Sequence, residues 1–349
     1  MLSYEDFTAK TRSRKDATKD VVAYIHFRNF ATLPRGVFAL IFFPMTPLLQ
    51  AIRPTTFIES AKLCEHLGLD VTIASETFQH TGSFKFRAAY NVAINVSNDE
   101  LIGVSSGNFG QALAYAAKLL GKKCTVIMPH NSAQVKVDAV RSYGAVADLI
   151  DVNVVSRSDR LAQLAAERPD AYLASAFDDQ LVIDGNATLG DEIAAHSFDV
   201  VVLPIGGGGL ISGMIQSFAR NGCNTEIIGA EPLLANDAAR SLRAGRLIAN
   251  ESEPQTIADG TRTLSLGKLN WPIIKDGLKE IIEVPDDTIA DALRMYFGLA
   301  NLKSEPTGAL SLGAIFMNRE AFVGRKICLV VSGGNVDPAI YAEILIGQT

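Results

Sequence analysis

Short apolar runs alternate with longer amphipathic segments over most of the 349-residue chain. The short runs are rich in Val, Ile and Leu and have the length of buried strands. The longer segments carry apolar residues at helical spacing, and several of them end at glycine. The expected strands cover 71–74, 101–106, 124–129, 147–150, 200–205, 226–230 and 326–331, and the expected helices cover 57–67, 86–93, 111–120, 132–143, 210–220, 288–302 and 308–317. This alternation predicts an α/β fold with mostly parallel sheets and crossover helices.

Three loops with glycine follow the ends of apolar strands, at 105–110, 206–209 and 332–335. In open α/β sheets, ligands bind at the edge formed by the carboxyl ends of the strands. We therefore expect these loops to meet at a binding site. The segment 45–49 precedes this pattern and is expected to be extended, because a residue before proline avoids the helical conformation.

The composition excludes several classes of protein. The chain is 48% hydrophobic and 20% charged, as in soluble globular proteins, and its net charge of −6 without a long basic run argues against nucleic acid or an anionic membrane as a partner. The apolar run at 37–49 is broken by prolines and too short to span a bilayer, and the N-terminus lacks a secretory pattern. The cysteines (Cys64, Cys124, Cys223 and Cys328) lie far apart and lack metal-ligand spacing, which favours free thiols in a reducing compartment. We expect a cytoplasmic protein, and residues 1–35 support no structural prediction.

The four consecutive glycines Gly206, Gly207, Gly208 and Gly209 lie between an expected strand and an expected helix. Their amide groups are unobstructed by side chains and adjoin a helix N-terminus, which favours binding of a phosphate. A tight turn that needs positive φ is the alternative, although one or two glycines would satisfy it. The run lacks both the Lys-Ser/Thr ending of a nucleoside-triphosphate loop and the spaced GxGxxG pattern. We therefore assign the phosphate to a small cofactor.

The other two loops and one lysine supply further candidate groups. Ser105, Ser106, Gly107 and Asn108 open a helix and could bind a carboxylate, with Asn108 also able to bond a phenolic oxygen; helix capping is the alternative. The hydroxyl of Ser332 could meet a ring nitrogen, or its segment could be a simple turn.

Lys85 follows Thr81-Gly82-Ser83-Phe84 and would be a nucleophile if burial lowers its pKa, whereas most lysines at this position are solvated. Together, a lysine nucleophile, a phosphate cradle, a carboxylate loop and a neutral ring partner are the groups that pyridoxal phosphate (PLP) needs when it acts on an amino acid.

Six motifs in order resemble the fold-type II PLP enzymes, specifically the serine/threonine dehydratase and serine racemase branch. The resemblance runs from about Pro44 to Asp337, through TGSFKFRAA (81–89), SSGNFGQALAYAAKLLG (105–121), PIGGGGLISG (204–213), GAEP (229–232), EPTGAL (305–310) and SGGNVD (332–337). It implies a two-domain fold similar to the tryptophan synthase β subunit, each domain a mostly parallel sheet flanked by helices. The large PLP-binding domain would comprise 1–97 plus 176–349, and a small mobile domain 98–175. The family also implies a homodimer, and no long C-terminal regulatory domain is expected because the chain ends soon after 332–337.

The resemblance also implies roles for individual residues. Lys85 would carry the cofactor, Phe84 would pack near its ring, and Asn108 would bond its phenolic oxygen. Gly206, Gly207, Gly208, Gly209 and Leu210 would hold the phosphate, and Ser332 would meet the pyridine nitrogen. The substrate carboxylate would bind to Ser105, Ser106, Gly107, Asn108 and Phe109. Ser106 matches the serine that racemases of this branch use as a second base on the face opposite the lysine.

A divalent cation site, for Mg²⁺ or Ca²⁺, is also frequent in this branch, and its positions correspond to Glu231, Ala235 through its carbonyl, and Asp237. Oxygen ligands suit these hard cations.

Several positions depart from the family pattern: Phe109 replaces a usual histidine, Ala88 a usual glycine, and 185–188 reads Gly-Asn-Ala-Thr for Gly-Gln-Gly-Thr. Ser75 stands where a lysine normally precedes the glutamate. These departures affect the substrate and the efficiency of catalysis rather than the cofactor residues.

The expected activity is β-elimination on a β-hydroxy amino acid of the serine, threonine or 3-hydroxyaspartate type, which releases a 2-oxo acid and ammonia. Three alternatives remain. An amino-acid racemase or a β-replacement or threonine-synthase-like enzyme would use the same fold. A nicotinamide-dependent oxidoreductase would need the GxGxxG pattern that is missing. A degenerate homologue that binds its ligand without turnover would account for the departures above.

Overall fold

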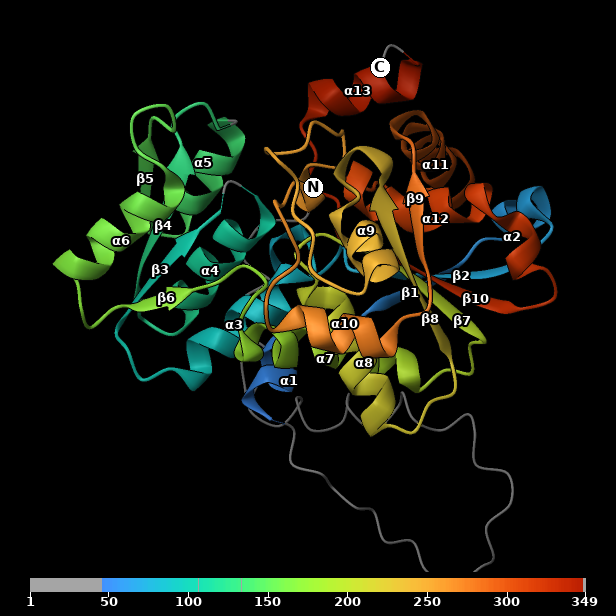
Figure 1. Cartoon of the computed structure of the whole chain (residues 1–349), viewed down its shortest axis with the longest axis horizontal. Coiled ribbons are helices and arrows are strands. Elements are labelled where there is room, and N and C mark those ends of the chain that lie inside the picture. The colour runs from blue at the N-terminus through green and yellow to red at the C-terminus, as the bar shows by residue number, and fades with distance from the viewer. Residues whose placement is uncertain (1–45, 106, 133, 348–349) are drawn as a thin grey trace, which may run out of the picture. The chain divides into compact units, whose positions relative to one another are not determined.

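The computed structural model describes residues 46–105, 107–132 and 134–347. These residues belong to one compact unit, 45–349, which contains two sheets (Figure 1). Met45 and Ser106 lie outside the described residues. The expected α/β class with parallel sheets flanked by helices is confirmed.

The larger sheet has six strands, and all neighbours in it are parallel except β1 and β2. Strand β10 lies in the middle, where Ile327 pairs with Val71 on one side and Val200 on the other. In spatial order the strands are β1 (Thr56–Glu59), β2 (Asp70–Ser75), β10 (Lys326–Val331), β7 (Val200–Pro204), β8 (Glu226–Pro232) and β9 (Ile281–Val284).

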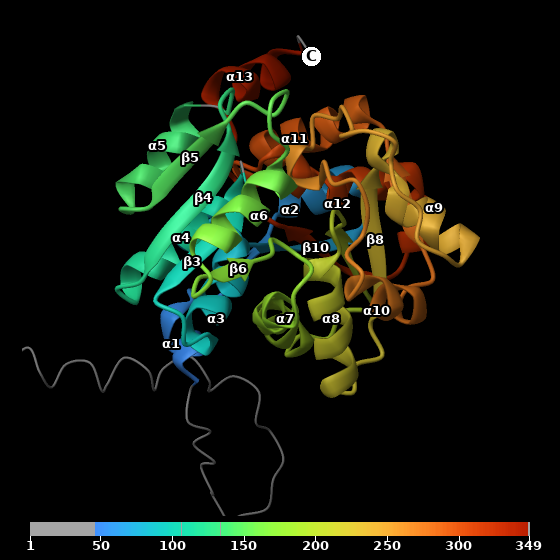
Figure 2. The same ribbon diagram turned by 60° about the vertical axis from the view of Figure 1, so that its left-hand side comes forward.

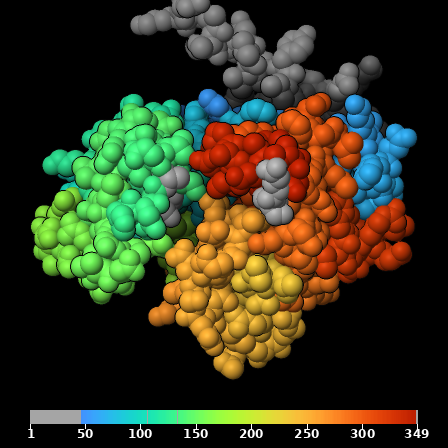
Figure 3. Space-filling view, turned by 90° about the horizontal axis from the view of Figure 1, so that it is seen from above, coloured from blue at the N-terminus to red at the C-terminus, as the bar shows by residue number. Residues whose placement is uncertain are grey.

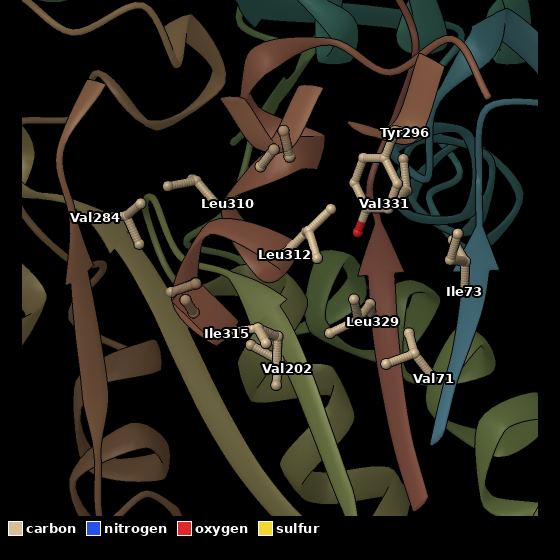
Figure 4. Close-up of a cluster of buried hydrophobic side chains, with 14 of the residues drawn as sticks. Val71, Ile73, Val202, Val284, Tyr296, Leu310, Leu312, Ile315, Leu329 and Val331 are labelled. Carbon is tan, nitrogen blue, oxygen red and sulfur yellow. The ribbon is translucent and has the colours of Figure 1, made fainter. Parts of the chain in front are cut away.

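Helices cover both faces of this sheet, and this explains why its strands are apolar throughout rather than alternating. Val202 and Leu329 belong to the core on one face, whereas Val201 and Cys328, one residue earlier, belong to the core on the other. Figure 4 shows the first core, where side chains of β2, β7 and β10 lie beside Leu310, Leu312 and Ile315. Helices α2 (Ala61–Leu67), α11 (Asp286–Ala300), α12 (Pro306–Met317) and α13 (Pro338–Ile346) contribute to this face, and α7 (Gln180–Ala194), α8 (Gly209–Arg220), α9 (Asp237–Ala244) and α10 (Asn270–Gly277) contribute to the other.

The smaller sheet is parallel and has four strands (Figure 2). Its strands in spatial order are β5 (Val146–Ile150), β4 (Lys123–Pro129), β3 (Glu100–Val104) and β6 (Tyr172–Ala174). Apolar residues of α3 (Lys85–Asn95), α4 (Asn108–Leu119) and α5 (Gln134–Ser142) share a core with one face, and α6 (Arg157–Glu167) supplies Leu164 to the other. All strands of this sheet come from the expected small domain; the division of the chain into two domains stays a prediction.

Two local predictions were wrong. Residues 57–67 do not form one helix, because Thr56–Glu59 pairs antiparallel with β2 at the sheet edge and the Ser60 hydroxyl caps a new helix by accepting from Leu63 N. The expected extended segment contains helix α1 (Pro47–Ala51). Only Thr46 before the proline is extended, since Pro47 at the first helical position already has a helical φ. None of the described helices is long and apolar enough to cross a membrane.

Candidate active site

A cavity of about 620 Å³ lies where the carboxyl ends of strands from both sheets meet. In the space-filling view of Figure 3, a recess separates the green surface of the smaller sheet and its helices from the yellow and orange surface of the larger one. The expected residues that line the cavity are Phe84, Lys85, Ser105, Gly107, Asn108, Phe109, Gly206, Gly207, Gly208, Gly209, Leu210 and Ser332. Glu231, Ala235 and Asp237 do not line it, and the placement of Ser106 is not described.

Strand order brings the cofactor residues together from distant parts of the sequence. Strands β2, β10 and β7 are adjacent and parallel, so the segments that follow them emerge at the same sheet edge. The segment after β2 leads to Lys85, the turn after β10 contains Ser332, and the loop after β7 is the glycine run. A bridge between Ser83 and Gly333, and a hydrogen bond of 3.0 Å from Phe84 N to Ser332 O, join the first two of these segments.

Lys85 is the first residue of α3 and is half-buried in the cavity wall. Its Nζ donates to the carbonyl oxygen of Ala176 at 2.8 Å and lies 5.0 Å from the ring centre of Phe84 and 5.9 Å from that of Phe109. Burial among these groups lowers the pKa of Lys85 to about 8, and the nearby carboxylate of Glu305 partly opposes this. The amine is therefore far more often neutral at physiological pH than that of a solvated lysine.

The glycine run adopts its conformation because its neighbours leave no room for side chains. A Cβ at Gly207 would overlap the ring of Phe177, and one at Gly209 would lie 2.9 Å from the Phe177 carbonyl oxygen. Gly208 has φ +94°, in the left-handed region that favours glycine, and precedes α8 as its N-cap. Both explanations that the sequence allowed therefore apply: the turn needs glycine, and its bare amides border the cavity at the start of a helix.

Two polar side chains complete this wall. The hydroxyl of Ser332 is buried, lines the cavity, and has no hydrogen-bond partner within the described part of the chain. Asn108 Nδ2 donates to both carboxylate oxygens of Glu305, at 2.8 and 3.0 Å, and Asn108 Oδ1 accepts from Asn335 Nδ2 at 2.9 Å. These contacts fix which atom of the Asn108 amide is donor and which is acceptor.

The sequence reasoning missed Glu305 as a site residue. Its carboxyl is buried in the cavity wall, and burial together with nearby Asp259 raises its pKa to about 7, while Asn108 and Lys136 act in the opposite direction. The only sequence signal was its place at the start of the EPTGAL motif. It was also impossible to foresee Phe177, which belongs to a segment without a recognised pattern.

Comparison with known proteins identifies the family of this site. The family described as "Pyridoxal-phosphate dependent enzyme" matches residues 48–333. The chain belongs to this family. Its β-hydroxyaspartate dehydratase relative from Paracoccus denitrificans (strain Pd 1222) is 37% identical over 292 residues, which are 82% of this chain and 92% of the relative.

Two solved structures place this PLP-family chain in the branch that the six motifs indicated. A threonine deaminase from T.th. is 37% identical with a TM-score of 0.75, and the match covers 81% of this chain and 92% of the deaminase. Maize serine racemase is 32% identical with a TM-score of 0.79, and the match covers 86% and 94% of the two chains. The resemblance to the dehydratase and racemase branch of the fold-type II PLP enzymes is thereby confirmed.

The cavity residues fit pyridoxal phosphate. Amide groups free of side chains suit its phosphate, the half-buried amine of Lys85 suits its aldehyde, and the unpartnered hydroxyl of Ser332 suits a neutral ring nitrogen. Each of these features would be an unsatisfied or costly arrangement in an ordinary protein core. The role of each residue toward the cofactor remains a prediction.

The expected cation positions lie apart from the cavity. Glu231 is buried and accepts from the amides of Ala238 and Ala239 at 3.0 and 2.8 Å, while Asp237 Oδ1 accepts from Asn250 at 2.8 Å. Asp237 Oδ2 is buried and has no hydrogen-bond partner among the residues that the structure describes. Burial raises the pKa of both carboxyls, that of Asp237 to about 6. No cluster of three or more His, Cys, Asp or Glu side chains in the described ranges could hold a metal ion.

Proposed function

We propose that this chain is a PLP-dependent ammonia-lyase that acts on a β-hydroxy amino acid and releases a 2-oxo acid and ammonia. The observation that carries the proposal is a single cavity that contains a lysine with a lowered pKa, a run of bare amides and an unpartnered serine hydroxyl. The similarity to a β-hydroxyaspartate dehydratase and a threonine deaminase supports elimination as the reaction type.

Lys85 is the residue we propose to move the α-proton. With a pKa of about 8, roughly 10% of its amine is neutral at pH 7, whereas a solvated lysine would be neutral in well under 0.1% of molecules. The carbonyl of Ala176, which accepts from this amine at 2.8 Å, orients it within the cavity. The bound cofactor would supply an electron-withdrawing ring that stabilises negative charge at the substrate Cα.

Asn108 and Ser332 are proposed to contact the cofactor ring from two sides. Glu305 and Asn335 hold the Asn108 amide so that its nitrogen is a donor, as bonding to a phenolic oxygen requires. Ser332 carries no charge and cannot fully protonate a ring nitrogen. This limits the accumulation of negative charge on the ring and favours prompt loss of the β-hydroxyl over slower alternatives. The loop of Ser105 and Asn108 is proposed to receive the substrate carboxylate.

Lys85→Ala tests this proposal. The purified wild-type protein should show a visible absorption band from bound PLP and should release oxo acid and ammonia without an added second nucleophile. Lys85→Ala should lose both the band and the turnover. Lys62→Ala, which changes an exposed lysine, is the control and should keep both.

The outcomes separate the rival functions. A requirement for a second nucleophile would favour β-replacement, and a bound band without turnover on any β-hydroxy amino acid would favour a homologue that only binds ligand. Retention of the band in Lys85→Ala would refute the assignment of this lysine. A panel of serine, threonine and 3-hydroxyaspartate stereoisomers would identify the substrate; the Paracoccus relative makes 3-hydroxyaspartate the first compound to assay.

Amino-acid racemisation is the second candidate, favoured by the similarity to maize serine racemase. The proposal assigns Ser106 as the base on the face opposite Lys85, and it derives from sequence alone because Ser106 lies outside the described residues. Ser106→Ala should remove racemisation while elimination of one enantiomer continues. An equal loss of both activities would contradict a two-base arrangement.

We further propose that Glu231, the Ala235 carbonyl and Asp237 bind Mg²⁺ or Ca²⁺, supported by the unpartnered Asp237 oxygen. We also propose a homodimer, from the family expectation, and a cytoplasmic location, from the four free cysteines, which suit a reducing compartment. Light scattering of the purified protein would test the dimer, and a monomer would refute it.

A further inference from the structure

Asn270 is a fully buried polar residue that lies beneath the glycine run, outside the set of expected site residues. It is the first residue of α10. Its Nδ2 donates to the carbonyl oxygens of Gly207 and Phe177, both at 2.9 Å. Since both neighbours are acceptors, the amide nitrogen must face them. The Gly207 oxygen also accepts from Gly267 N at 3.0 Å.

These hydrogen bonds fix the direction of one peptide group in the cradle. In a trans peptide the C=O and the following N–H point in opposite directions. The Gly207 carbonyl points toward Asn270 and Gly267, so the N–H of Gly208 points to the other side of the loop. Without Asn270, only the N–H of Gly267 would still hold this carbonyl among the described residues, and the peptide could rotate more easily because glycine allows most backbone conformations.

The amides of the loop are available to a ligand. Within the described ranges, no backbone carbonyl accepts a hydrogen bond from the N–H groups of Gly206, Gly207 or Gly208. All three residues line the cavity. A helix start follows directly at Gly209 and adds further free N–H groups.

Asn270 also connects this loop to the acceptor of the lysine. Its second bond holds the Phe177 carbonyl, and Phe177 directly follows Ala176, whose carbonyl oxygen accepts from Lys85 Nζ. The Phe177 ring fills the space beside Gly207. One buried side chain therefore links the proposed phosphate cradle with the segment that orients the amine.

We propose that Asn270 is a positioning residue that orients the Gly207–Gly208 peptide so that the loop binds the phosphate group of pyridoxal phosphate. This inference rests on the proposed function, because it assumes that the glycine run holds that phosphate. It predicts a specific loss. Removal of the Asn270 amide weakens the contribution of the phosphate group to cofactor affinity and leaves the contacts to the cofactor ring unchanged.

The test compares pyridoxal phosphate with pyridoxal, which lacks only the phosphate. Apoprotein of the full chain is titrated with each compound, and the ratio of the two dissociation constants measures the phosphate contribution. Asn270→Leu should weaken pyridoxal phosphate binding about tenfold, with less than about a twofold change for pyridoxal. The ³¹P chemical shift of the bound phosphate should also move toward that of the free compound.

Asn91→Leu is the matched control. Asn91 is also buried and donates from Nδ2 to a backbone carbonyl, but this carbonyl is that of Leu181, at 2.7 Å, and not one in the glycine run. This variant should keep the wild-type ratio. If Asn270→Leu does not fold, Asn270→Ser, which is smaller and retains one donor, should show an intermediate loss of the ratio.

Equal weakening of both compounds in the Asn270 variants would overturn the inference, because it would indicate general damage to the site. An unchanged ratio would overturn it as well. Both results leave the proposed function intact, provided that wild-type protein prefers pyridoxal phosphate. Wild-type protein that binds neither compound would instead refute the proposed function.

Discussion

Asp237→Asn should stabilise the cation-free protein at neutral pH, although it changes a fully buried residue. Burial raises the pKa of Asp237 from 3.8 to about 6, and its Oδ2 accepts no hydrogen bond from any residue in the described part of the chain. The pKa of nearby Glu231 is raised as well, by burial and by the Asp237 charge. Ionisation of these carboxyls therefore lowers the stability of the native state, and a bound divalent cation would remove this free-energy cost.

The magnitude follows from linkage. A rise from 3.8 to about 6 corresponds to about 3 kcal/mol of lost stability once Asp237 is ionised in both states. Because the folded-state pKa is the higher one, the native state binds more protons than the unfolded state between pH 4 and 6. The stability contribution thus falls as pH rises through this window and stays low above it. An unpartnered amide in place of Oδ2 costs about 1 kcal/mol, so the net gain at pH 7.5 is about 2 kcal/mol.

The assay is urea unfolding of wild type and Asp237→Asn at pH 4 and pH 7.5, with a chelator or with Mg²⁺ or Ca²⁺. The variant should be more stable than wild type at pH 7.5 in chelator, and this difference should vanish at pH 4. The cation should stabilise wild type and have little effect on the variant. Asp70→Asn, at an exposed carboxylate, should keep both the wild-type stability at pH 7.5 in chelator and the wild-type stabilisation by the cation. A variant less stable than wild type at pH 7.5 in chelator would refute the reasoning, because Asp237 would then stabilise the fold as an anion.

Three further substitutions test the cavity and its support. Gly207→Ala should greatly weaken pyridoxal phosphate binding because its Cβ would overlap the Phe177 ring, and the added change Phe177→Ala should restore part of the affinity; wild-type affinity in the single variant would contradict this packing. Glu305→Gln removes the carboxylate that raises the pKa of Lys85, so the pH profile for attachment of pyridoxal phosphate to the apoprotein should move to lower pH. An unmoved profile would exclude this coupling. Arg87→Met removes the only charged partner of the buried Glu76 carboxylate among the described residues, the guanidinium whose Nε lies 2.7 Å away, and leaves it the hydrogen bond from the Thr55 hydroxyl. The variant should lower the free energy of unfolding by about 3–5 kcal/mol; a loss below about 1 kcal/mol would contradict the burial of this ion pair.

Much of the fold was predictable because each buried strand and each amphipathic helix carries its own local signal. Strands such as Lys326–Val331 are apolar on both faces, and only a sheet covered by helices on both sides satisfies that pattern. Predictions failed where tertiary contacts overrode local preference. Thr56–Glu59 is a strand because β2 offers it an edge to pair with. Helix α7 was not predicted, although Asp179 caps it and its buried apolar residues recur at helical spacing.

Short stretches of the chain were enough to define the chemistry available at this site: a lysine at a helix start, a run of bare amides and a neutral serine, each recognisable within a few residues. The side chains that surround these groups could be known only from the packed molecule. The adjacency of β2, β10 and β7 depends on sheet pairing between segments far apart in the chain. Glu305, Phe177 and Asn270 act through contacts with residues distant in sequence, and no local pattern encodes such contacts, because they form only when packed elements bring the groups within hydrogen-bond distance.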